Sequence, residues 1–244
     1  MTRGRLIGIG IGPGAPGRIT LEAVEVIRKA DVICTPRSEN KEESIAYEII
    51  KRWCTGKRIV AMPYSMAPDH KAREKSWQDH AQTIASSCSE GELVAFVTLG
   101  DPGLYSTFAY VAKLVRGIDS QIPVAIVPGV TSVSACAAAI GQSLAQAEET
   151  LTIQPCSQVL AKRGVWWRNF DCVVVMKIGR KLPDLVKHLH RLSLLEHTTL
   201  VTRAGFGTGT ITSGSDLLTC DAQNGYLATM FVRAGVNNET GAKK

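Results

Sequence analysis

The chain has 244 residues, 45% of them hydrophobic and 20% charged, and its formal net charge at pH 7 is +6. This length allows one large α/β domain or two modest ones, with an ample core in either case. The composition is typical of an ordinary soluble globular protein. No run of about eighteen apolar residues is present, so we expect no membrane span.

The positive charge suits an anionic ligand, but the basic residues are dispersed and aromatic residues make up only 6% of the chain. We therefore expect no nucleic-acid partner. The seven cysteines are scattered without a close pair, which indicates reduced, buried thiols rather than disulfides or a metal site. The first apolar run is short, rich in glycine and followed by a turn, so it predicts a strand rather than a signal peptide. We expect a cytoplasmic protein.

Strands alternate with helices in the first half of the chain. Thr20 is the expected N-cap of a helix that ends near Ala30, with Leu21, Val24 and Ile27 at helical spacing. This alternation predicts a mainly parallel sheet with flanking helices. The other expected elements are strands over 5–11, 30–36 (ended by Pro36), 57–63, 92–98 and 122–129, and helices over 42–53, 68–89 and 104–115.

The second half of the chain changes character. Strands dominate it, so we expect a mixed, partly antiparallel sheet. We place the domain boundary in the turn after the 104–115 helix, which gives an N-terminal domain over 1–118 and a C-terminal domain over 119–244. The expected elements are helices over 132–140 and 181–195 and strands over 150–155, 171–179, 198–205, 209–214 and 225–235.

The first glycine-rich loop, GPGAPG at 12–17, has the three-glycine spacing of dinucleotide-binding loops. Pro13 and Pro16, however, remove two of the N–H donors that would cradle a pyrophosphate. The acidic residue that should end the second strand is also missing, because Asp31 begins that strand. The remaining alternatives are a plain strand-to-helix turn and a loop that lines a ligand cleft without binding phosphates.

The second glycine-rich loop, TLGDPG at 98–103, follows a buried strand and thus lies at the ligand-binding edge of a parallel sheet. One alternative is that Asp101 only caps a helix that starts near Pro102 or Gly103. That alternative does not explain Gly100, where glycine allows a close approach to the backbone. The segment VPGVTS at 127–132 repeats the pattern. These residues alone predict an α/β ligand-binding enzyme.

Three motifs in order, GIGIGPGAPGRITLEAVEVIRKADVI, VTLGDPGLYSTFAYV and VPGVTSVSACAAAIGQSL, resemble the tetrapyrrole methylases. This family uses S-adenosylmethionine (SAM) on uroporphyrinogen and corrin precursors. The segments ADVICTP, MPYSMAPDHKAREKSWQDHAQTIA, GDPGLYSTFAYV and VVVMKIGRK are similar to the members that methylate carbon 20 of precorrin-2 or cobalt-factor II in cobalamin biosynthesis. The alternative within the family is another ring carbon of a corrin intermediate.

The resemblance implies two α/β domains with SAM in a cleft between them, and a homodimer. It implies that the first loop faces the tetrapyrrole. The residues that it places at SAM are Leu99, Gly100, Asp101, Leu104, Thr131, Ser132, Ile178, Ala204 and Gly205; those that it places at the substrate are Pro13, Gly14, Pro36 and Tyr105. Two positions depart from the family: Ala15 stands where the first loop usually carries an aspartate, and Arg203 stands in place of a glutamate.

Methyl transfer from a sulfonium to carbon is an in-line displacement that needs no enzyme nucleophile. A base can assist the later loss of a proton, and Asp101 is the catalytic candidate, with Tyr105 and Tyr110 as alternatives. Arg18, Arg37 and Lys177 are possible partners of substrate carboxylates. Two other classes of function stay open at this point: a dinucleotide-dependent oxidoreductase and a non-catalytic tetrapyrrole carrier.

Overall fold

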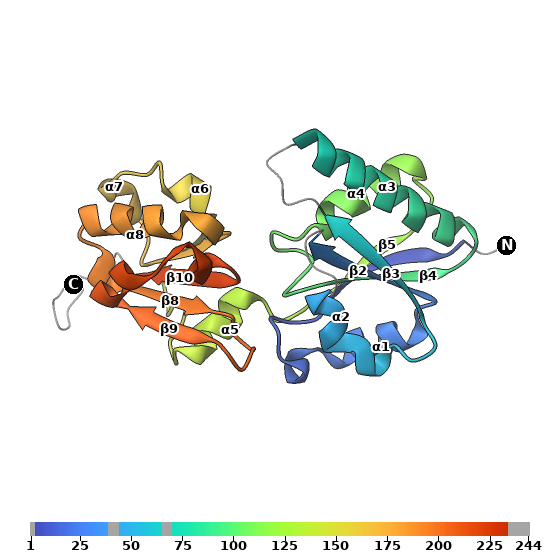
Figure 1. The fold of residues 1–244 in the computed structure, drawn as a ribbon, viewed down its shortest axis with the longest axis horizontal. Helices are drawn as coiled ribbons and strands as arrows, with labels where there is room; N and C mark the ends of the chain where they lie inside the picture. The colour runs from blue at the N-terminus through green and yellow to red at the C-terminus, as the bar shows by residue number, and fades with distance from the viewer. Residues whose placement is uncertain (1–2, 39–43, 65–69, 234–244) are drawn as a thin grey trace. The chain divides into compact units, whose positions relative to one another are not determined.

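The computed structural model describes residues 3–38, 44–64 and 70–233. The chain folds into two compact units, Met1–Thr131 and Ser132–Lys244, and each unit has its own five-stranded sheet (Figure 1). The first sheet is parallel throughout and the second is mixed, so the predicted fold class is confirmed.

The first sheet has the strand order β3-β2-β4-β1-β5. Because all its strands run in one direction, their carboxyl ends lie at one edge, where parallel sheets usually bind ligands. The strands are β1 (Arg5–Gly10), β2 (Val32–Ser38), β3 (Arg58–Tyr64), β4 (Leu93–Thr98) and β5 (Val124–Val127).

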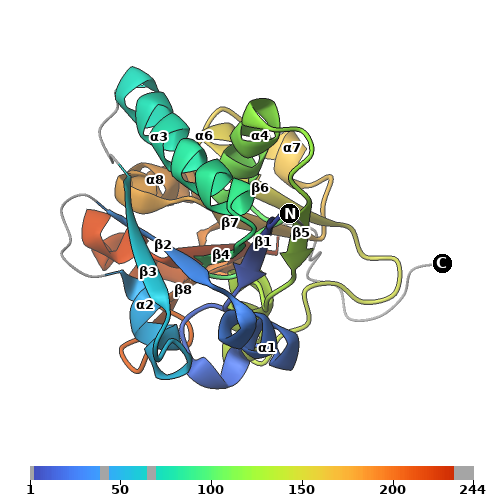
Figure 2. The same ribbon diagram turned by 90° about the vertical axis from the view of Figure 1, so that its right-hand side faces the viewer.

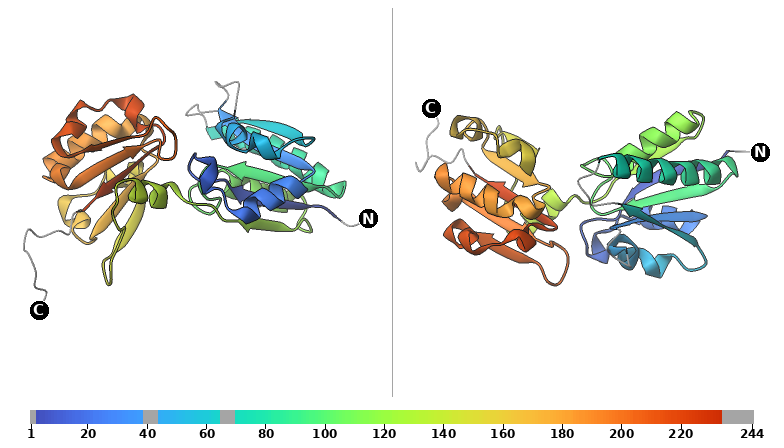
Figure 3. Two further views of the ribbon diagram at one scale, coloured as in Figure 1. Left: turned by 90° about the horizontal axis from the view of Figure 1, so that it is seen from below. Right: turned by 45° about the horizontal axis from the view of Figure 1, so that its top comes forward.

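Helices cover both faces of the first sheet. Helices α1 (Leu21–Lys29) and α2 (Ile45–Ile50) lie on one face, and α3 (His70–Ser89) and α4 (Phe108–Ile118) lie on the other (Figures 1 and 2). Helices α3 and α4 lie side by side (Figure 3, right). The first residues of the helices expected over 42–53 and 68–89, namely 42–43 and 68–69, lie outside the described residues.

In helix α1, one prediction from the sequence is confirmed and another is wrong. The Thr20 hydroxyl accepts a hydrogen bond from the backbone N–H of Ala23 at 3.2 Å, so the predicted N-cap is confirmed. Ile27 is fully buried, but Leu21 is 84% exposed. Leu21 is the first residue of the helix, and its position there leaves the side chain in solvent although its spacing matches the buried face.

The strand expected to end at Pro36 continues to Ser38. Its pairing with β4 stops at Cys34, whereas its pairing with β3 runs from Val32 to Ser38. Beyond Cys34 the strand thus has a neighbour on one side only. Proline lacks an N–H and is tolerated where a ladder bond is not required, which explains why Pro36 does not end the strand.

The division between the two units lies after Thr131, not at the expected boundary between 118 and 119. Strand β5 follows the expected boundary, yet it pairs in parallel with β1 from Leu6↔Val124 to Ile9↔Val127. It is therefore the edge strand of the first sheet. The residues at 117–120 predict a turn, but a turn prediction contains no information about pairing between strands far apart in the sequence.

The second sheet has the strand order β6-β7-β10-β8-β9. Only β6 and β7 are parallel; the other neighbours are antiparallel. Helix α5 lies on one face, and α6, α7 and α8 lie on the other (Figure 1). The bounds are α5 (Ser132–Ala139), β6 (Leu151–Pro155), α6 (Cys156–Val159), α7 (Gly164–Trp167), β7 (Cys172–Met176), α8 (Leu182–Arg191), β8 (Thr198–Thr202), β9 (Thr210–Ser213) and β10 (Ala228–Val232).

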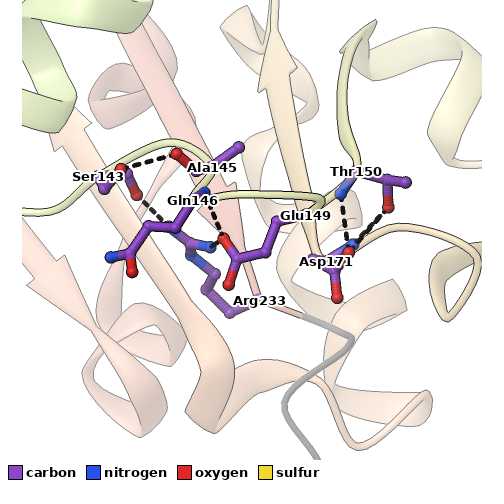
Figure 4. A network of polar contacts seen from close by, with 7 residues as sticks. All are labelled: Ser143, Ala145, Gln146, Glu149, Thr150, Asp171 and Arg233. Atoms are coloured by element: carbon purple, nitrogen blue, oxygen red, sulfur yellow. Dashed lines mark hydrogen bonds and ion pairs between the residues drawn. The ribbon is translucent and has the colours of Figure 1, made fainter. Parts of the chain in front are cut away.

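Arg233 and Asp171 hold the segment between α5 and β6 (Figure 4). The Arg233 guanidinium pairs with Glu149 at 3.2 Å and donates to the carbonyl of Ser143. The Asp171 carboxylate accepts from the backbone N–H of Thr150 at 2.8 Å and from its hydroxyl at 3.0 Å. These contacts fasten the segment to the ends of β10 and β7.

Across the part of the chain that the structure describes, no helix is both long enough and apolar enough to cross a membrane.

Candidate functional site

The two glycine-rich loops of the first unit are joined directly. The backbone N–H of Gly100 donates to the carbonyl of Gly12 at 2.8 Å, and the N–H of Gly12 donates back to the carbonyl of Gly100 at 3.3 Å. Gly12 follows β1 and Gly100 follows β4, and these strands are neighbours in the sheet. The loops therefore form one structure at the carboxyl edge of the sheet.

A third loop, which follows β5, reaches the same point through glycines. A Cβ at Gly129 would lie 2.3 Å from the carbonyl oxygen of Gly100, and a Cβ at Gly10 would lie 2.5 Å from the backbone nitrogen of Gly129. Any side chain here would overlap backbone atoms. The predicted close approach at Gly100 is thus the approach of the protein's own backbone, and Gly100 also has a φ of +74°, which glycine adopts readily.

Asp101 links two of these loops. Its Oδ1 accepts a hydrogen bond from the backbone N–H of Gly103 at 2.7 Å, and its Oδ2 accepts one from the N–H of Gly129 at 2.8 Å. Helix α4 begins only at Phe108, so the alternative in which Asp101 caps a helix near Pro102 is wrong. Both carboxylate oxygens already bind backbone groups, so Asp101 fixes the geometry of the loops.

Hydrogen bonds of Ser106 hold the segment between Asp101 and α4 in place. The Ser106 hydroxyl bonds the Thr98 hydroxyl at 3.2 Å and accepts from the backbone N–H of Phe108 at 3.1 Å. Tyr105 has a φ of +51°, a strained conformation for a residue with a side chain, and is 40% exposed. Such strain clusters at functional sites. The helix expected from residue 104 starts only at Phe108, whose ring packs against Gly8, where a Cβ would lie 2.5 Å from it.

The other candidates of the first unit lie on the same three loops, Pro36 excepted. Leu99 and Leu104 are half-buried beside Gly100 and Asp101, while Pro13 and Gly14 are buried after β1. Pro36 lies in β2, and its carbonyl accepts from the Ser44 hydroxyl at 2.7 Å. Thr131 is the last residue of the first unit and Ser132 the first of the second. The structure thus groups Leu99, Gly100, Asp101 and Leu104 with the first loop.

The remaining candidates, Ile178, Ala204 and Gly205, lie in the second unit, where strands β7 and β8 end. Ile178 is 2% exposed and belongs to the core of that unit, so only its backbone is available for contact. The chain next to them is strained: Lys177 has a φ of +54° and Arg203 a φ of +47°. The N–H of Arg203 donates to the carbonyl of Leu227, itself at +52°, at 2.8 Å. Strain concentrated at one edge of a sheet points to a functional role.

A buried pair of rings was not found by sequence reasoning. The rings of Tyr64, at the carboxyl end of β3, and His80, in α3, meet edge to face with their centroids 4.8 Å apart. The Tyr64 hydroxyl and His80 Nδ1 are buried, and neither has a hydrogen-bond partner among the residues that the structure describes. Burial lowers the pKa of His80 and raises that of Tyr64, so both are neutral at neutral pH. No local sequence signal marks this pair, because it depends on the packing of α3.

The cysteines are mostly buried. Six of the seven are buried, and Cys220 is half-exposed. Burial raises the pKa of the Cys34 thiol to about 12, which keeps it protonated and unreactive. Within residues 3–38, 44–64 and 70–233, no group of three or more His, Cys, Asp and Glu side chains is placed to hold a metal ion.

The chain resembles known proteins over almost its whole length. Residues 5–215 match the family model for Tetrapyrrole (Corrin/Porphyrin) Methylases. A protein of Methanocaldococcus jannaschii named "Probable cobalt-precorrin-2 C(20)-methyltransferase" is 34% identical, over 94% of this chain and 96% of its own. The "Cobalt-precorrin-2 C(20)-methyltransferase" of Salmonella typhimurium is 28% identical, over 82% of this chain and 84% of its own.

Solved structures share the fold. A cobalt precorrin-4 methyltransferase superposes with a TM-score of 0.72 at 19% identity, covering 96% of both chains. The uroporphyrin-III C-methyltransferase of Thermus thermophilus, complexed with S-adenosylhomocysteine, superposes with a TM-score of 0.64 at 18% identity, over 94% of this chain and 97% of its own.

Proposed function

Because the chain belongs to the tetrapyrrole (corrin/porphyrin) methylases, we propose that it transfers the methyl group of SAM to carbon 20 of precorrin-2 or cobalt-factor II in cobalamin biosynthesis. The observation that carries this proposal is the 34% identity to a protein named for that reaction, over 94% of this chain. The joined loops at the carboxyl edge of the first sheet are where such a fold binds its ligands.

The residues of these loops fit SAM in their chemistry. The half-buried side chains of Leu99 and Leu104 offer apolar contact to the methionine methylenes, and the backbone between them is held rigid by Asp101. SAM supplies an electrophilic methyl group on a sulfonium whose leaving group departs neutral. We assign its binding to Leu99, Gly100, Asp101 and Leu104, with contributions from Thr131, Ser132, Ile178, Ala204 and Gly205.

The chain's contribution to the reaction is positioning. A displacement at a methyl group needs donor and acceptor in line, and holding them so supplies much of the acceleration. Gly10, Gly100 and Gly129 bring three loops into backbone contact, which gives this part of the site a fixed shape. We assign the substrate side to Pro13, Gly14, Pro36 and Tyr105. Asp101 is assigned a positioning role, because both of its oxygens already accept backbone hydrogen bonds.

We also propose that the protein works as a homodimer in the cytoplasm, as the family resemblance implies. Sedimentation equilibrium measures the oligomeric state directly. A mass that stays at that of one chain across the micromolar range would contradict the dimer.

Binding and turnover test the proposed function in two steps. Calorimetry is expected to show saturable binding of S-adenosylhomocysteine. Incubation with SAM and cobalt-factor II, or with precorrin-2, is then expected to yield a product heavier by one methyl group in mass spectrometry. Binding of NADH in place of S-adenosylhomocysteine would favour an oxidoreductase, and tetrapyrrole binding without turnover would favour a carrier.

A further inference from the structure

Arg18 carries a charge that the fold does not neutralise. Its Nη1 is buried and has no hydrogen-bond partner, and no ion pair of Arg18 is present among the described residues. The Arg18 side chain as a whole is half-buried. A guanidinium cannot release its proton in a protein, and a buried N–H of a charged group without a partner is costly. Buried polar groups without partners are rare, and each requires an explanation.

Arg18 belongs to the loop pair described above. It ends a short 3-10 turn, Pro16–Arg18, which follows β1. A Cβ at Gly12 would lie 2.7 Å from the carbonyl oxygen of Arg18 and 3.3 Å from its Cβ, so Arg18 packs against Gly12. Gly12 in turn is hydrogen-bonded to Gly100. The backbone and Cβ of Arg18 therefore lie against the loop pair to which SAM binding is assigned.

The turn itself offers Arg18 no anion. The backbone N–H of Arg18 donates to the carbonyl of Ala15 at 2.9 Å, which makes residues 15 and 18 the two ends of a 3-10 turn. The residue at the other end of the turn is Ala15, its N-cap, whose methyl group offers Arg18 no charged partner.

We propose that Arg18 binds a carboxylate of the tetrapyrrole and is a substrate-recognition residue of this enzyme. The inference rests on the proposed function, since the tetrapyrrole supplies the carboxylates. Arginine suits the role because its planar fork matches a carboxylate with two parallel hydrogen bonds. The free protein keeps the cation unpaired, and the substrate completes the pair. SAM also has a carboxylate, so the test measures the two ligands separately.

The first variants are Arg18→Met, which keeps the length of the side chain without its charge, and Arg18→Lys, which keeps the charge without the fork. Cobalt-factor II binding is followed by anaerobic absorbance titration, and S-adenosylhomocysteine binding by calorimetry. We expect Arg18→Met to weaken cobalt-factor II binding about 10- to 150-fold, the range for a hydrogen bond to a charged group. The cobalt-factor II affinity of Arg18→Lys is expected to lie between that of Arg18→Met and that of wild type. S-adenosylhomocysteine affinity stays within about twofold of wild type, a margin well below that loss.

Stability separates substrate recognition from a structural role. Arg18→Met removes the buried N–H that lacks a partner and keeps the apolar length of the side chain, so the Tm of the variant is expected to equal or exceed that of wild type. An arginine that holds the fold together would instead lower the Tm on substitution. A lower Tm with unchanged cobalt-factor II affinity would overturn the proposal.

A second pair of variants leaves Arg18 in place. Ala15→Asp puts a competing carboxylate beside the guanidinium, and we expect a higher Tm together with cobalt-factor II binding weakened about tenfold or more. Ala15→Asn is the matched control, because it caps the turn equally well without a charge and is expected to keep wild-type affinity. Equal affinity of the Asp and Asn variants would overturn the proposal.

The remaining outcomes are also decisive. Loss of S-adenosylhomocysteine binding in Arg18→Met, with cobalt-factor II binding intact, would assign Arg18 to the SAM carboxylate and overturn the proposal. Tight cobalt-factor II binding by wild type that Arg18→Met leaves unchanged would overturn the role of Arg18 alone. Wild-type protein that binds S-adenosylhomocysteine but no tetrapyrrole would overturn the proposed function as well.

Discussion

The carboxylate of Asp101 accepts a hydrogen bond from the backbone N–H of Gly129 at 2.8 Å and thereby joins the loop after β4 to the loop after β5. Its second oxygen accepts from the N–H of Gly103 at 2.7 Å within its own loop. An aspartate held in this way fixes the shape of the loops that meet the ligand.

Asp101→Asn tests the bridging role. The amide retains one accepting oxygen but presents an NH₂ group to the second backbone N–H, which leaves a donor facing a donor. We expect a loss of about 1–3 kcal/mol in the free energy of unfolding and weaker S-adenosylhomocysteine binding, measured by urea denaturation and calorimetry.

Asp221→Asn is the control for this substitution. Asp221 also accepts two backbone N–H groups, from Gln223 at 2.8 Å and Asn224 at 3.3 Å, but within one turn of the second unit. Both bonds end on Oδ1, which asparagine retains, so the substitution is expected to change neither the free energy of unfolding nor S-adenosylhomocysteine affinity. Normal stability and affinity of Asp101→Asn would contradict the bridging role.

Gly129→Ala tests the close approach of the three loops. The new Cβ would lie 2.3 Å from the carbonyl oxygen of Gly100, so the loops must separate. We expect a loss of about 1–3 kcal/mol in stability and a large loss of S-adenosylhomocysteine binding. Gly117→Ala is the control: it lies in α4, where an added Cβ meets nothing within 4 Å, and it should stabilise the protein by about 0.5–1 kcal/mol. If both variants bind the ligand like wild type, the loop contact is irrelevant to the site.

His80 gives a pH dependence of stability. Burial lowers its pKa in the folded protein below the ordinary value of 6.5. As the pH falls through 6.5, the unfolded chain takes up the proton before the folded one does, so the folded state loses stability. Above that pH the contribution is fully present. His80→Phe, which keeps a ring against Tyr64, is expected to reduce the fall in Tm between pH 7.5 and pH 5.5. An unchanged fall would show that His80 is not the group responsible.

Thiol labelling tests the burial of the cysteines. Burial raises the pKa of Cys34 to about 12 and the pKa values of Cys54 and Cys88 to about 11, and only a thiolate reacts readily. We expect iodoacetamide at neutral pH to modify the half-exposed Cys220 first, as read by peptide mass spectrometry, and all seven cysteines to react in denaturant. Rapid labelling of Cys34 in the native protein would contradict this burial.

Periodicity and capping residues predicted most of the elements, because these signals are local. Thr20 caps α1 as expected, and both sheets have the predicted character. The errors arose where contacts between residues far apart in the sequence determine the structure. Pro36 remains in its strand because β4 has already separated from it, and β5 joins the first sheet by pairing with β1.

The candidate site was predictable in outline but not in its internal contacts. The motifs marked the loops that carry Gly100 and Gly12, and the structure joins the two by hydrogen bonds. The sequence left open whether Asp101 caps a helix, since that depends on where α4 begins. Helix α4 begins at Phe108, which packs against Gly8, a contact between residues one hundred positions apart that no local pattern predicts. Short helices such as α6 and α7 were missed because four residues show no period.

The position of the transferred methyl group tests the central claim most directly. The protein is incubated with SAM labelled with ¹³C in the methyl group and, in separate reactions, with precorrin-2 and cobalt-factor II, and the product is examined by NMR. We expect one new labelled methyl group on carbon 20 with at least one of the two acceptors. A labelled methyl group on any other ring carbon, or none with either acceptor, would contradict it.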